Sequence, residues 1–410
     1  MTSSDKLRHV VYVGYELEDR RAPHQAMGAV FLALQGHQVT YLATGSEQAP
    51  AWTSALQSLD YLKFPGSRRR AGLSLMRHLL SILRTGAVDC LYIQGAQQAV
   101  LCTWVPWLFP RLEIIYHTQD FKPLITPLYS WAEGVLARCS TQVICNEINR
   151  AKVMELVHRL RSTPAVIRTA LPAAWPVPAR NEGRRKKILA NLPTELRAEA
   201  VLIVAGGAYM TRRRSQQLVQ ALAHLDQRYC LIFTGMERDN PQYENCLAEA
   251  DAHEVRDRVV LLPRITYYDL LALYADCEIG VLLYCDSDLA NFYQGPGRVT
   301  EYLRSGIGFV VSNYPGLELM TLKYEVGAAA RPDDPADIAR AIRALTPRNA
   351  SGRRANAKRL RNLARTTLAY EHDARAVFGE KFSLRSEAEQ IAHPLWKAIT
   401  DRERVEREDD

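Results

Sequence analysis

Residues 295–316, with the sequence GPGRVTEYLRSGIGFVVSNYPG, decide the fold of this chain. The stretch begins with a glycine-rich loop at 295–297, and the apolar residues that follow recur at the spacing of a helix. Gly306 is suited to end that helix, and the apolar residues 309–311 predict a short buried strand. Residues 314–316, Tyr-Pro-Gly, predict a turn out of the strand. This succession of loop, helix, strand and turn is typical of an α/β domain.

The start of the predicted helix is chemically suited to a phosphate. Gly295 and Gly297 leave backbone N–H groups accessible, and the helix N-terminus carries a partial positive charge. Glu301 lies one turn into the helix, where its carboxylate is placed to accept hydrogen bonds from sugar hydroxyls. The alternative is an ordinary connection in which Glu301 only favours the helix N-terminus.

The stretch resembles the donor-site segment of GT-B glycosyltransferases, especially the family-4-like members of glycosyl transferases group 1. The family often has a proline, a basic residue, Glu-Tyr-Leu, a glycine and a buried strand that ends in Pro-Gly. The matching residues here are Pro296, Arg298, Glu301-Tyr302-Leu303, Gly306 and Pro315-Gly316. The resemblance implies that Glu301 binds the ribose of a nucleotide sugar, and that Gly295, Gly297 and Arg298 hold its diphosphate.

The remaining sequence favours two domains of the α/β class. The chain has 410 residues, which is too many for one ordinary core, and its 47% of hydrophobic residues excludes a disordered chain. Buried apolar strands such as 10–13 alternate with helical segments, which predicts βαβ units. We expect the GT-B architecture of two Rossmann-like, doubly wound domains at 1–175 and 185–372. A terminal helix and charged tail, 373–410, would pack back on the first domain. The proline-rich linker 171–187 carries a basic cluster that we expect to be solvated.

A second anion-binding pattern follows the predicted strand 201–205. Gly206-Gly207 precedes three arginines at 212–214, which we expect at the start of a helix, where the macrodipole disfavours cations. The glycines let backbone approach an anion, and the arginines would neutralise it. The resemblance implies that Gly207 and Arg213, six residues apart, contact the donor diphosphate.

Two further candidate residues stand at the carboxyl ends of predicted strands, where ligands bind in open α/β sheets. His117 follows the predicted strand 112–116, and Arg264 comes after the predicted strand 259–262. A lone histidine in this position is often structural. The resemblance implies that His117 lies close to the transferred sugar and acts in catalysis together with Arg213, and that Arg264 lies near the nucleotide base.

The sequence also contains features that point away from this interpretation. Asp286 and Asp288 form an Asp-x-Asp segment that by itself resembles the metal motif of GT-A glycosyltransferases. The Glu-Tyr-Leu stretch favours GT-B instead, so we expect no metal site and no cofactor, the nucleotide sugar being a substrate. Many retaining GT-B enzymes have a second glutamate eight residues before the ribose glutamate, and here Tyr293 occupies that position.

The charge of the chain bears on its partners and location. A net charge of +7 favours an anionic ligand or surface. No nucleic acid is expected, because zinc-ligand spacing, aromatic RNA-binding motifs and long basic runs are missing.

Eight cysteines without a CxxC pair, and an N-terminus without a signal-peptide core, predict a cytoplasmic protein. The segment 67–84 predicts a basic amphipathic helix, either a peripheral contact at the inner face of a membrane or a packed crossover helix. Trp104 and Trp107 are expected in the core.

The expected function is a glycosyltransferase of the hexosyltransferase class, which moves a sugar from a nucleotide diphosphate donor to an unknown hydroxyl acceptor with retention of configuration. Two alternatives stay open. One is an epimerase of the GT-B fold that needs no acceptor, and the other is a non-catalytic protein that binds anions or nucleic acid.

Overall fold

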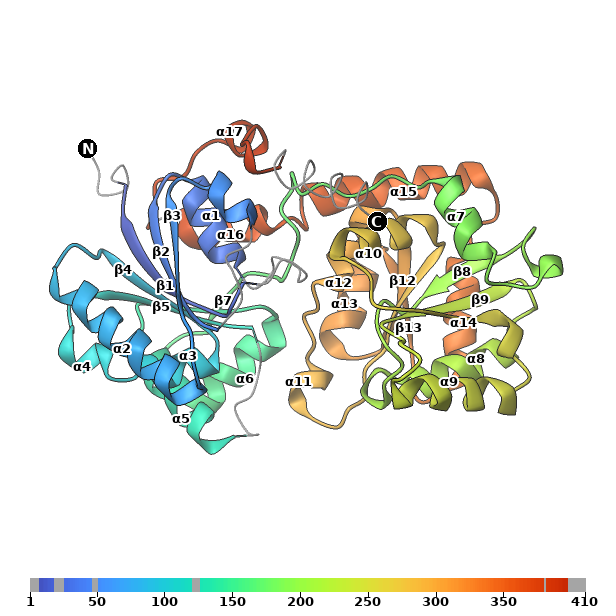
Figure 1. Ribbon diagram of the computed structural model, residues 1–410, viewed down its shortest axis with the longest axis horizontal. Helices are drawn as coiled ribbons and strands as arrows, with labels where there is room; N and C mark the ends of the chain where they lie inside the picture. The colour runs from blue at the N-terminus through green and yellow to red at the C-terminus, as the bar shows by residue number, and fades with distance from the viewer. Residues whose placement is uncertain (1–6, 18–25, 46–50, 120–125, 380, 397–410) are drawn as a thin grey trace. The chain divides into compact units, whose positions relative to one another are not determined.

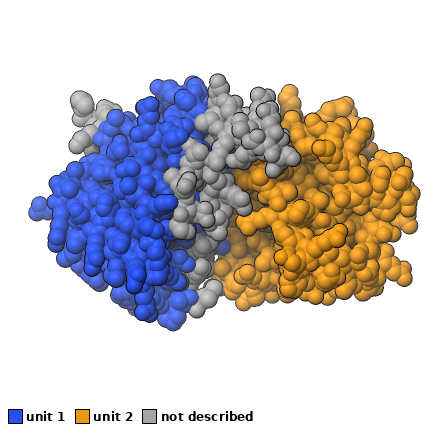
Figure 2. Space-filling view, in the orientation of Figure 1, with its two compact units in different colours: residues 1–176, 369–410 blue, residues 177–368 orange. Residues whose placement is uncertain are grey.

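The computed structural model describes residues 7–17, 26–45, 51–119, 126–379 and 381–396. The chain divides into two compact units, coloured separately in Figure 2, at residues 1–176 with 369–410 and at residues 177–368. We describe each unit by itself.

Within the described residues, the first unit contains a parallel sheet of seven strands in the order β3-β2-β1-β4-β5-β6-β7. The strands are β1 (His9–Val13), β2 (Gln38–Thr44), β3 (Leu59–Phe64), β4 (Cys90–Gln94), β5 (Glu113–Thr118), β6 (Gln142–Cys145) and β7 (Ala165–Val166). The helices are α1 (Met27–Leu34), α2 (Arg68–Arg84), α3 (Ala96–Cys102), α4 (Val105–Leu108), α5 (Pro127–Cys139), α6 (Ile148–His158), α16 (Tyr370–Phe378) and α17 (Glu387–Ile391), with a 3₁₀ turn, η3 (Ala51–Ala55). Figure 1 shows α1 and α16 on one face of this sheet and α2, α3 and α5 on the other.

The second unit has a parallel sheet of six strands, in the order β10-β9-β8-β11-β12-β13. The strands are β8 (Val201–Val204), β9 (Tyr229–Thr234), β10 (Val259–Leu262), β11 (Ile279–Leu282), β12 (Gly308–Ser312) and β13 (Gly327–Ala330). The helices are α7 (Glu182–Leu189), α8 (Ser215–Ala223), α9 (Pro241–Ala252), α10 (Tyr267–Asp276), α11 (Leu289–Phe292), α12 (Arg298–Ser305), α13 (Pro315–Tyr324), α14 (Pro335–Leu345) and α15 (Ala350–Arg365). Three 3₁₀ turns complete it: η4 (Thr194–Leu196), η5 (Thr211–Arg213) and η6 (Arg256–Arg258).

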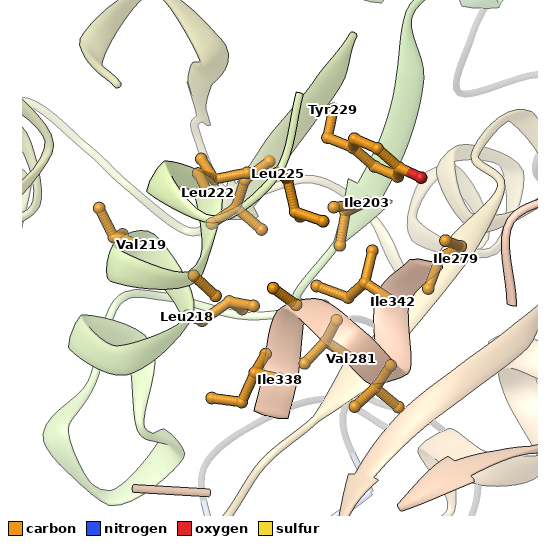
Figure 3. Packing of buried hydrophobic residues seen from close by; sticks show 14 of the residues in the cluster. Ile203, Leu218, Val219, Leu222, Leu225, Tyr229, Ile279, Val281, Ile338 and Ile342 are labelled. Atoms are coloured by element: carbon orange, nitrogen blue, oxygen red, sulfur yellow. The ribbon is translucent and has the colours of Figure 1, made fainter. Parts of the chain in front are cut away.

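The core of the second unit lies between its sheet and helices α8 and α14, as Figure 3 shows. Ile203 of β8 and Val281 of β11 are buried against Leu218 of α8 and Ile338 of α14. Both helices bury one apolar stripe, which is the pattern of a helix that covers a sheet. The Asp334 side chain accepts hydrogen bonds from the first backbone N–H groups of α14, a cap that stabilises the helix by about 1 kcal/mol.

The chain returns to the first unit at Ala369. Phe378 of α16 stacks on Phe31 of α1, with 5.9 Å between ring centroids, and Asp373 accepts two hydrogen bonds from the Arg168 guanidinium. Helix α16 therefore belongs to the core of the first unit. The domains predicted from the sequence were 1–175 and 185–372, and the two compact units of the structure are 1–176 with 369–410, and 177–368.

The structure corrects in part the expectation that the basic cluster of the linker is solvated. Arg184 pairs with Asp276 at 2.8 Å and Arg185 pairs with Glu278 at 3.0 Å, and both carboxylates are buried. Carboxylates at buried positions need counter-charges, and the basic cluster supplies them. Arg184 and Arg185 thus secure α7 to the second unit, whereas Lys186 and Lys187 are exposed to solvent as expected.

Three other local predictions also need correction. Arg212 and Arg213 lie in the turn η5, and Arg214 has a left-handed φ of 50°, so α8 begins only at Ser215. Residues 314–316 start helix α13, because Pro315 is suited to the first helical position. Trp107 is 66% exposed and lies outside the core. The helix at 298–305 and the strand after it are confirmed.

Candidate active site

The N-terminus of α12 carries Arg298 and Glu301 at the carboxyl edge of the second sheet. The helix is fixed there by Tyr302, whose hydroxyl donates to the carbonyl oxygens of Val204 and Val281 at 3.1 and 3.2 Å. Gly280 makes room for this ring, since a Cβ there would lie 2.6 Å from it. The glutamate and the arginine are therefore held by contacts to the ends of two central strands, β8 and β11.

Glu301 is 5% exposed and accepts a hydrogen bond from the Tyr267 hydroxyl at 3.1 Å. Burial raises the pKa of Tyr267 well above its ordinary value, and the adjacent Glu301 carboxylate raises it further. Tyr267 therefore remains a protonated donor and orients the carboxylate.

The loop after β8 meets the start of α12. Gly206 has a φ of +59°, and a Cβ at this position would lie 2.5 Å from the Tyr274 hydroxyl and 2.8 Å from that of Tyr302. Only glycine suits both the backbone conformation and this space. At Gly207 a Cβ would lie 3.6 Å from Arg298 Nη2, so the guanidinium of Arg298 lies over the glycine backbone.

A cavity of about 150 Å³ lies at this junction, lined by Gly207, Arg213, Arg298 and other residues from the η5 and β11 segments. None of its lining residues is acidic. Arg213 Nη1 is buried and has no hydrogen-bond partner in the part of the chain that the structure describes. The same guanidinium lies 4.2 Å from the ring centroid of Tyr284, which fixes its position. An unpartnered buried donor on a cation indicates a site for an anion.

Arg298 supplies a second cation to this cavity. Burial lowers its pKa, but Tyr274, Tyr302, Tyr284 and Glu301 raise it more, so the pKa lies above its ordinary value. Arg298 keeps its charge at every physiological pH.

The neighbours of Arg213 have other roles. Arg212 is exposed, and its carbonyl oxygen accepts from the backbone N–H of Cys285. Arg214 pairs with Asp286 at 3.3 Å and with Asp333 at 2.8 Å. Of the three arginines, only Arg213 lines the cavity.

The Asp-x-Asp segment has structural contacts of its own. Asp286 is the partner of Arg214, and the Asp288 side chain accepts from the backbone N–H of Asn291 at 2.8 Å, which caps α11. Among the described residues, no three His, Cys, Asp or Glu side chains gather as a metal site would require.

Four of the expected donor-site residues do not line the cavity: Arg264, Gly295, Gly297 and Glu301. Gly295 lies in the loop before α12 and is half-buried. Arg264 is exposed after β10, and its backbone N–H donates to Glu237 at 2.9 Å.

His117 lies near the end of β5 in the first unit and is 1% exposed. Its Nδ1 lies 2.7 Å from the Tyr92 hydroxyl, and burial lowers its pKa to about 3, so the ring is neutral. His117 Nε2 and the Nε2 of Gln94, its register partner on β4, are both buried without a hydrogen-bond partner in the described residues. Two unpartnered polar groups thus lie side by side at the carboxyl edge of this sheet.

Sequence reasoning missed Tyr92, Gln94, Tyr267 and Tyr284. Tyr92 and Gln94 lie two residues apart in β4, so the alternation of a strand places both side chains on one face. The sequence therefore contained the information that these two residues lie together. Tyr267 and Tyr284 reach Glu301 and Arg213 from distant segments, so no local pattern indicates them.

Comparisons with known proteins give matches at the level of family model and fold. The family model Glycosyl transferases group 1 matches residues 199–347, and no curated protein matches the chain. HepE from Anabaena, solved in complex with UDP and glucose, has a TM-score of 0.63 and 12% identity over 96% of this chain and 99% of its own. Sucrose-phosphate synthase from Thermosynechococcus elongatus has a TM-score of 0.59 and 13% identity over 98% of both chains. WaaG, a glycosyltransferase involved in lipopolysaccharide biosynthesis, has a TM-score of 0.60 and 14% identity over 91% of this chain and 99% of its own.

The chain therefore has the GT-B fold of glycosyltransferases, as the sequence predicted. The match to the family model Glycosyl transferases group 1 falls within the second unit.

Proposed function

We propose that the protein transfers a sugar from a nucleotide diphosphate donor to a hydroxyl acceptor. The observation that carries this proposal is the buried, unpartnered Nη1 of Arg213 in a cavity that also contains Gly207 and Arg298. UDP and glucose in the HepE structure agree with a donor of this class and make UDP the first nucleotide to test.

Arg213 and Arg298 would hold the diphosphate, with N–H groups around Gly297 at the start of α12. Charge-assisted hydrogen bonds to phosphate are strong, and they strengthen when the departing diphosphate gains negative charge. Catalysis would therefore be largely electrostatic. Glu301, oriented by Tyr267, would accept hydrogen bonds from the ribose hydroxyls.

Gly295 and Arg264 do not line the cavity and would contact other parts of the donor. Gly295 would contribute to the loop that approaches the diphosphate, and the exposed Arg264 side chain would reach the nucleotide base. Arg264→Ala should change the preference among nucleotide bases and leave pyrophosphate binding unchanged.

His117 would position the sugar or the acceptor through Nε2. Because burial lowers its pKa to about 3, it acts as a neutral hydrogen-bonding group and not as a cation. Tyr92 fixes the ring from the other side at 2.7 Å. The unpartnered Nε2 of Gln94 beside it offers a second contact for a sugar hydroxyl.

The proposed reaction is a hexosyl transfer that retains configuration and needs no metal. Arg213 and Arg298 supply the positive charge that a divalent cation supplies elsewhere, and Asp286 and Asp288 are engaged with Arg214 and the start of α11. Activity that disappears with a chelator and returns with manganese would refute this part. The anomeric configuration of the product, read by NMR, tests retention.

The acceptor side of the proposal includes a peripheral membrane contact of a cytoplasmic protein. No helix in the described ranges is long and apolar enough to span a bilayer. Helix α2 instead exposes Arg69 and Arg70 near Leu73, and its Arg68 donates to the Tyr129 hydroxyl of α5, which itself exposes Trp131. Basic residues beside exposed aromatic and leucine side chains suit an anionic membrane surface.

The membrane contact is tested by sedimentation with phosphatidylglycerol vesicles. The Arg69→Glu/Arg70→Glu variant should lose binding, and wild-type binding that is equal to neutral vesicles would refute the contact.

The transfer itself is tested by nucleotide stabilisation followed by a product assay. Wild-type protein should be stabilised by a nucleoside diphosphate, and Arg213→Ala should lose that stabilisation. Incubation of the nucleotide sugar with and without hydroxyl acceptors then distinguishes transfer from epimerisation, since an epimerase needs no acceptor.

A further inference from the structure

A second basic cavity lies on the opposite edge of the sheet of the second unit. It measures about 790 Å³, within the roughly 300–1,000 Å³ of small-ligand pockets. Its floor is the amino edge of the sheet, where Gly308 opens β12, and its wall is helix α15. Figure 1 shows α15 beside α7 along this edge of the unit. The donor cavity lies at the carboxyl edge, so the two cavities are separate sites.

The lining of this cavity is strongly basic. Seven arginine and lysine side chains line it, against three carboxylates. One of the three, Glu278, is already neutralised by Arg180, Arg185 and Arg353 at 3.0 to 3.3 Å. The carboxylates of the lining are therefore too few to neutralise its arginine and lysine side chains.

Four of the six basic residues of α15 form one stripe. Arg354, Lys358, Arg361 and Arg365 recur at intervals of four, three and four residues, which places them on one face of the helix. The helix contains no acidic residue along its length. Arg354, Lys358 and Arg365 are exposed and form no ion pair in the described part of the chain.

Like charges oppose one another within this stripe and beside it. Burial, and then the like charge of Arg365, lower the pKa of Arg361, and burial and Arg180 lower that of Arg353. A bound anion would relieve this repulsion.

Two basic residues of α15, Arg361 within the stripe and Arg359 outside it, have structural roles that explain why the helix lies here. Arg361 Nη2 donates to the Ser305 carbonyl at 2.9 Å, and Arg359 donates to the Glu325 carbonyl at 2.7 Å. Cations are favourable at the C-termini of helices, here α12 and α13. Arg354, Lys358 and Arg365 have no such role, so a structural explanation accounts for only part of the stripe.

We propose that this cavity is a binding site for a compact anion with two or more phosphate groups. Arg354, Lys358 and Arg365 of the stripe would contact the phosphates, and apolar lining residues such as Ile307 and Val326 would contact the rest of the molecule. The proposal does not rest on sugar transfer, since it concerns the other edge of the sheet. Such phosphates can belong to a free metabolite or to a phosphorylated lipid headgroup.

The test uses inorganic tripolyphosphate as the probe, in isothermal titration with the full chain. The Arg213→Ala variant, which lacks the donor-site cation, should keep one binding event. The same variant with Arg354→Ala, Lys358→Ala and Arg365→Ala should bind about tenfold or more weakly, because three charge-assisted contacts are lost.

A matched control removes three exposed positive charges of the same unit outside the cavity, with Arg343→Ala, Arg348→Ala and Lys187→Ala. This control should bind tripolyphosphate as the Arg213→Ala protein does. Equal weakening in both triple variants would show a diffuse charge effect and overturn the proposal, as would unchanged affinity in the stripe variant. Circular dichroism confirms that both triple variants are folded.

A second arm identifies the source of the phosphate. Vesicles that contain a phosphatidylinositol bisphosphate, whose headgroup carries more than one phosphate group, are sedimented with the Arg69→Glu/Arg70→Glu variant, which lacks the α2 contact. Binding that depends on Arg354, Lys358 and Arg365 assigns a lipid headgroup, and tripolyphosphate binding without vesicle binding assigns a free anion. Failure to bind either probe overturns the proposal.

Discussion

The Arg213→Ala substitution tests whether the Arg213 guanidinium binds the donor in the cavity. In the folded protein without ligand, Arg213 Nη1 is buried without a partner among the described residues, and such a group costs about 1–3 kcal/mol. Its guanidinium gains roughly 0.5–2 kcal/mol from its contact with Tyr284. These two effects oppose each other, so the change in the free energy of unfolding should lie between a loss of about 1 kcal/mol and a gain of about 2.5 kcal/mol.

The same substitution should have a much larger effect on turnover. A hydrogen bond between a guanidinium and a phosphate contributes about 1.5–3 kcal/mol, and this contact strengthens as the diphosphate leaves. We therefore expect kcat to fall by about ten- to a hundredfold, with a smaller rise in the KM of the donor. The assay is initial velocity against donor concentration at saturating acceptor, with urea unfolding of the same samples.

Neighbouring arginines provide the controls for this experiment. Arg212→Ala removes an exposed side chain and should leave kcat unchanged, and Arg213→Lys should restore part of the activity because the charge remains. Full turnover in Arg213→Ala would show that the cavity does not hold the leaving group. An unfolded Arg213→Ala protein would show instead that the residue is structural, and either result refutes the reasoning.

Three further predictions concern single residues. Glu301→Ala should weaken nucleoside diphosphate binding by about 1.5–3 kcal/mol in titration calorimetry while pyrophosphate binding is unchanged, and equal loss for both ligands would contradict the ribose contact. Gly206→Ala should lower the free energy of unfolding by roughly 2–4 kcal/mol, because the new Cβ would lie 2.5 Å from the Tyr274 hydroxyl and the backbone there is left-handed. The control is Gly86→Ala, where φ is +70° but the space around the Cβ is open. This substitution should lower the free energy of unfolding by only about 1–2 kcal/mol. His117 has a pKa of about 3 in the folded protein, below its value in the unfolded chain, so the folded state binds fewer protons. The neutral form of His117 therefore contributes stability at neutral pH, and this contribution is lost as the pH falls from the unfolded pKa towards 3. The slope of the unfolding free energy between pH 6 and 4 should be smaller in His117→Gln by up to about 1.4 kcal/mol per pH unit, and an unchanged slope would show that His117 is protonated in the fold.

Local patterns predicted the segment around α12 well. The helix starts after the glycine-rich loop, and Gly306 ends it with φ +87°, because glycine alone adopts this conformation without strain. Both features depend on residues within one helical turn of each other. Continuous apolar runs such as β11 likewise indicated buried parallel strands.

Features that depend on distant residues were not predictable. The three arginines at 212–214 were expected in a helix, but Arg214 adopts a left-handed conformation and pairs with Asp286 and Asp333, far along the chain. Likewise, nothing beside His117 in the sequence indicates that Tyr92 is its partner.

The central claim is that the diphosphate of a nucleotide sugar binds beside Arg213. A crystal structure with the nucleoside diphosphate that most stabilises the protein, chosen from UDP, GDP, ADP and CDP, tests it most directly. The account predicts phosphate oxygens within hydrogen-bond distance of Arg213 Nη1 and the Arg298 guanidinium, with the ribose hydroxyls on Glu301. A nucleotide bound elsewhere on the second unit, or a phosphate turned away from Arg213, would contradict it.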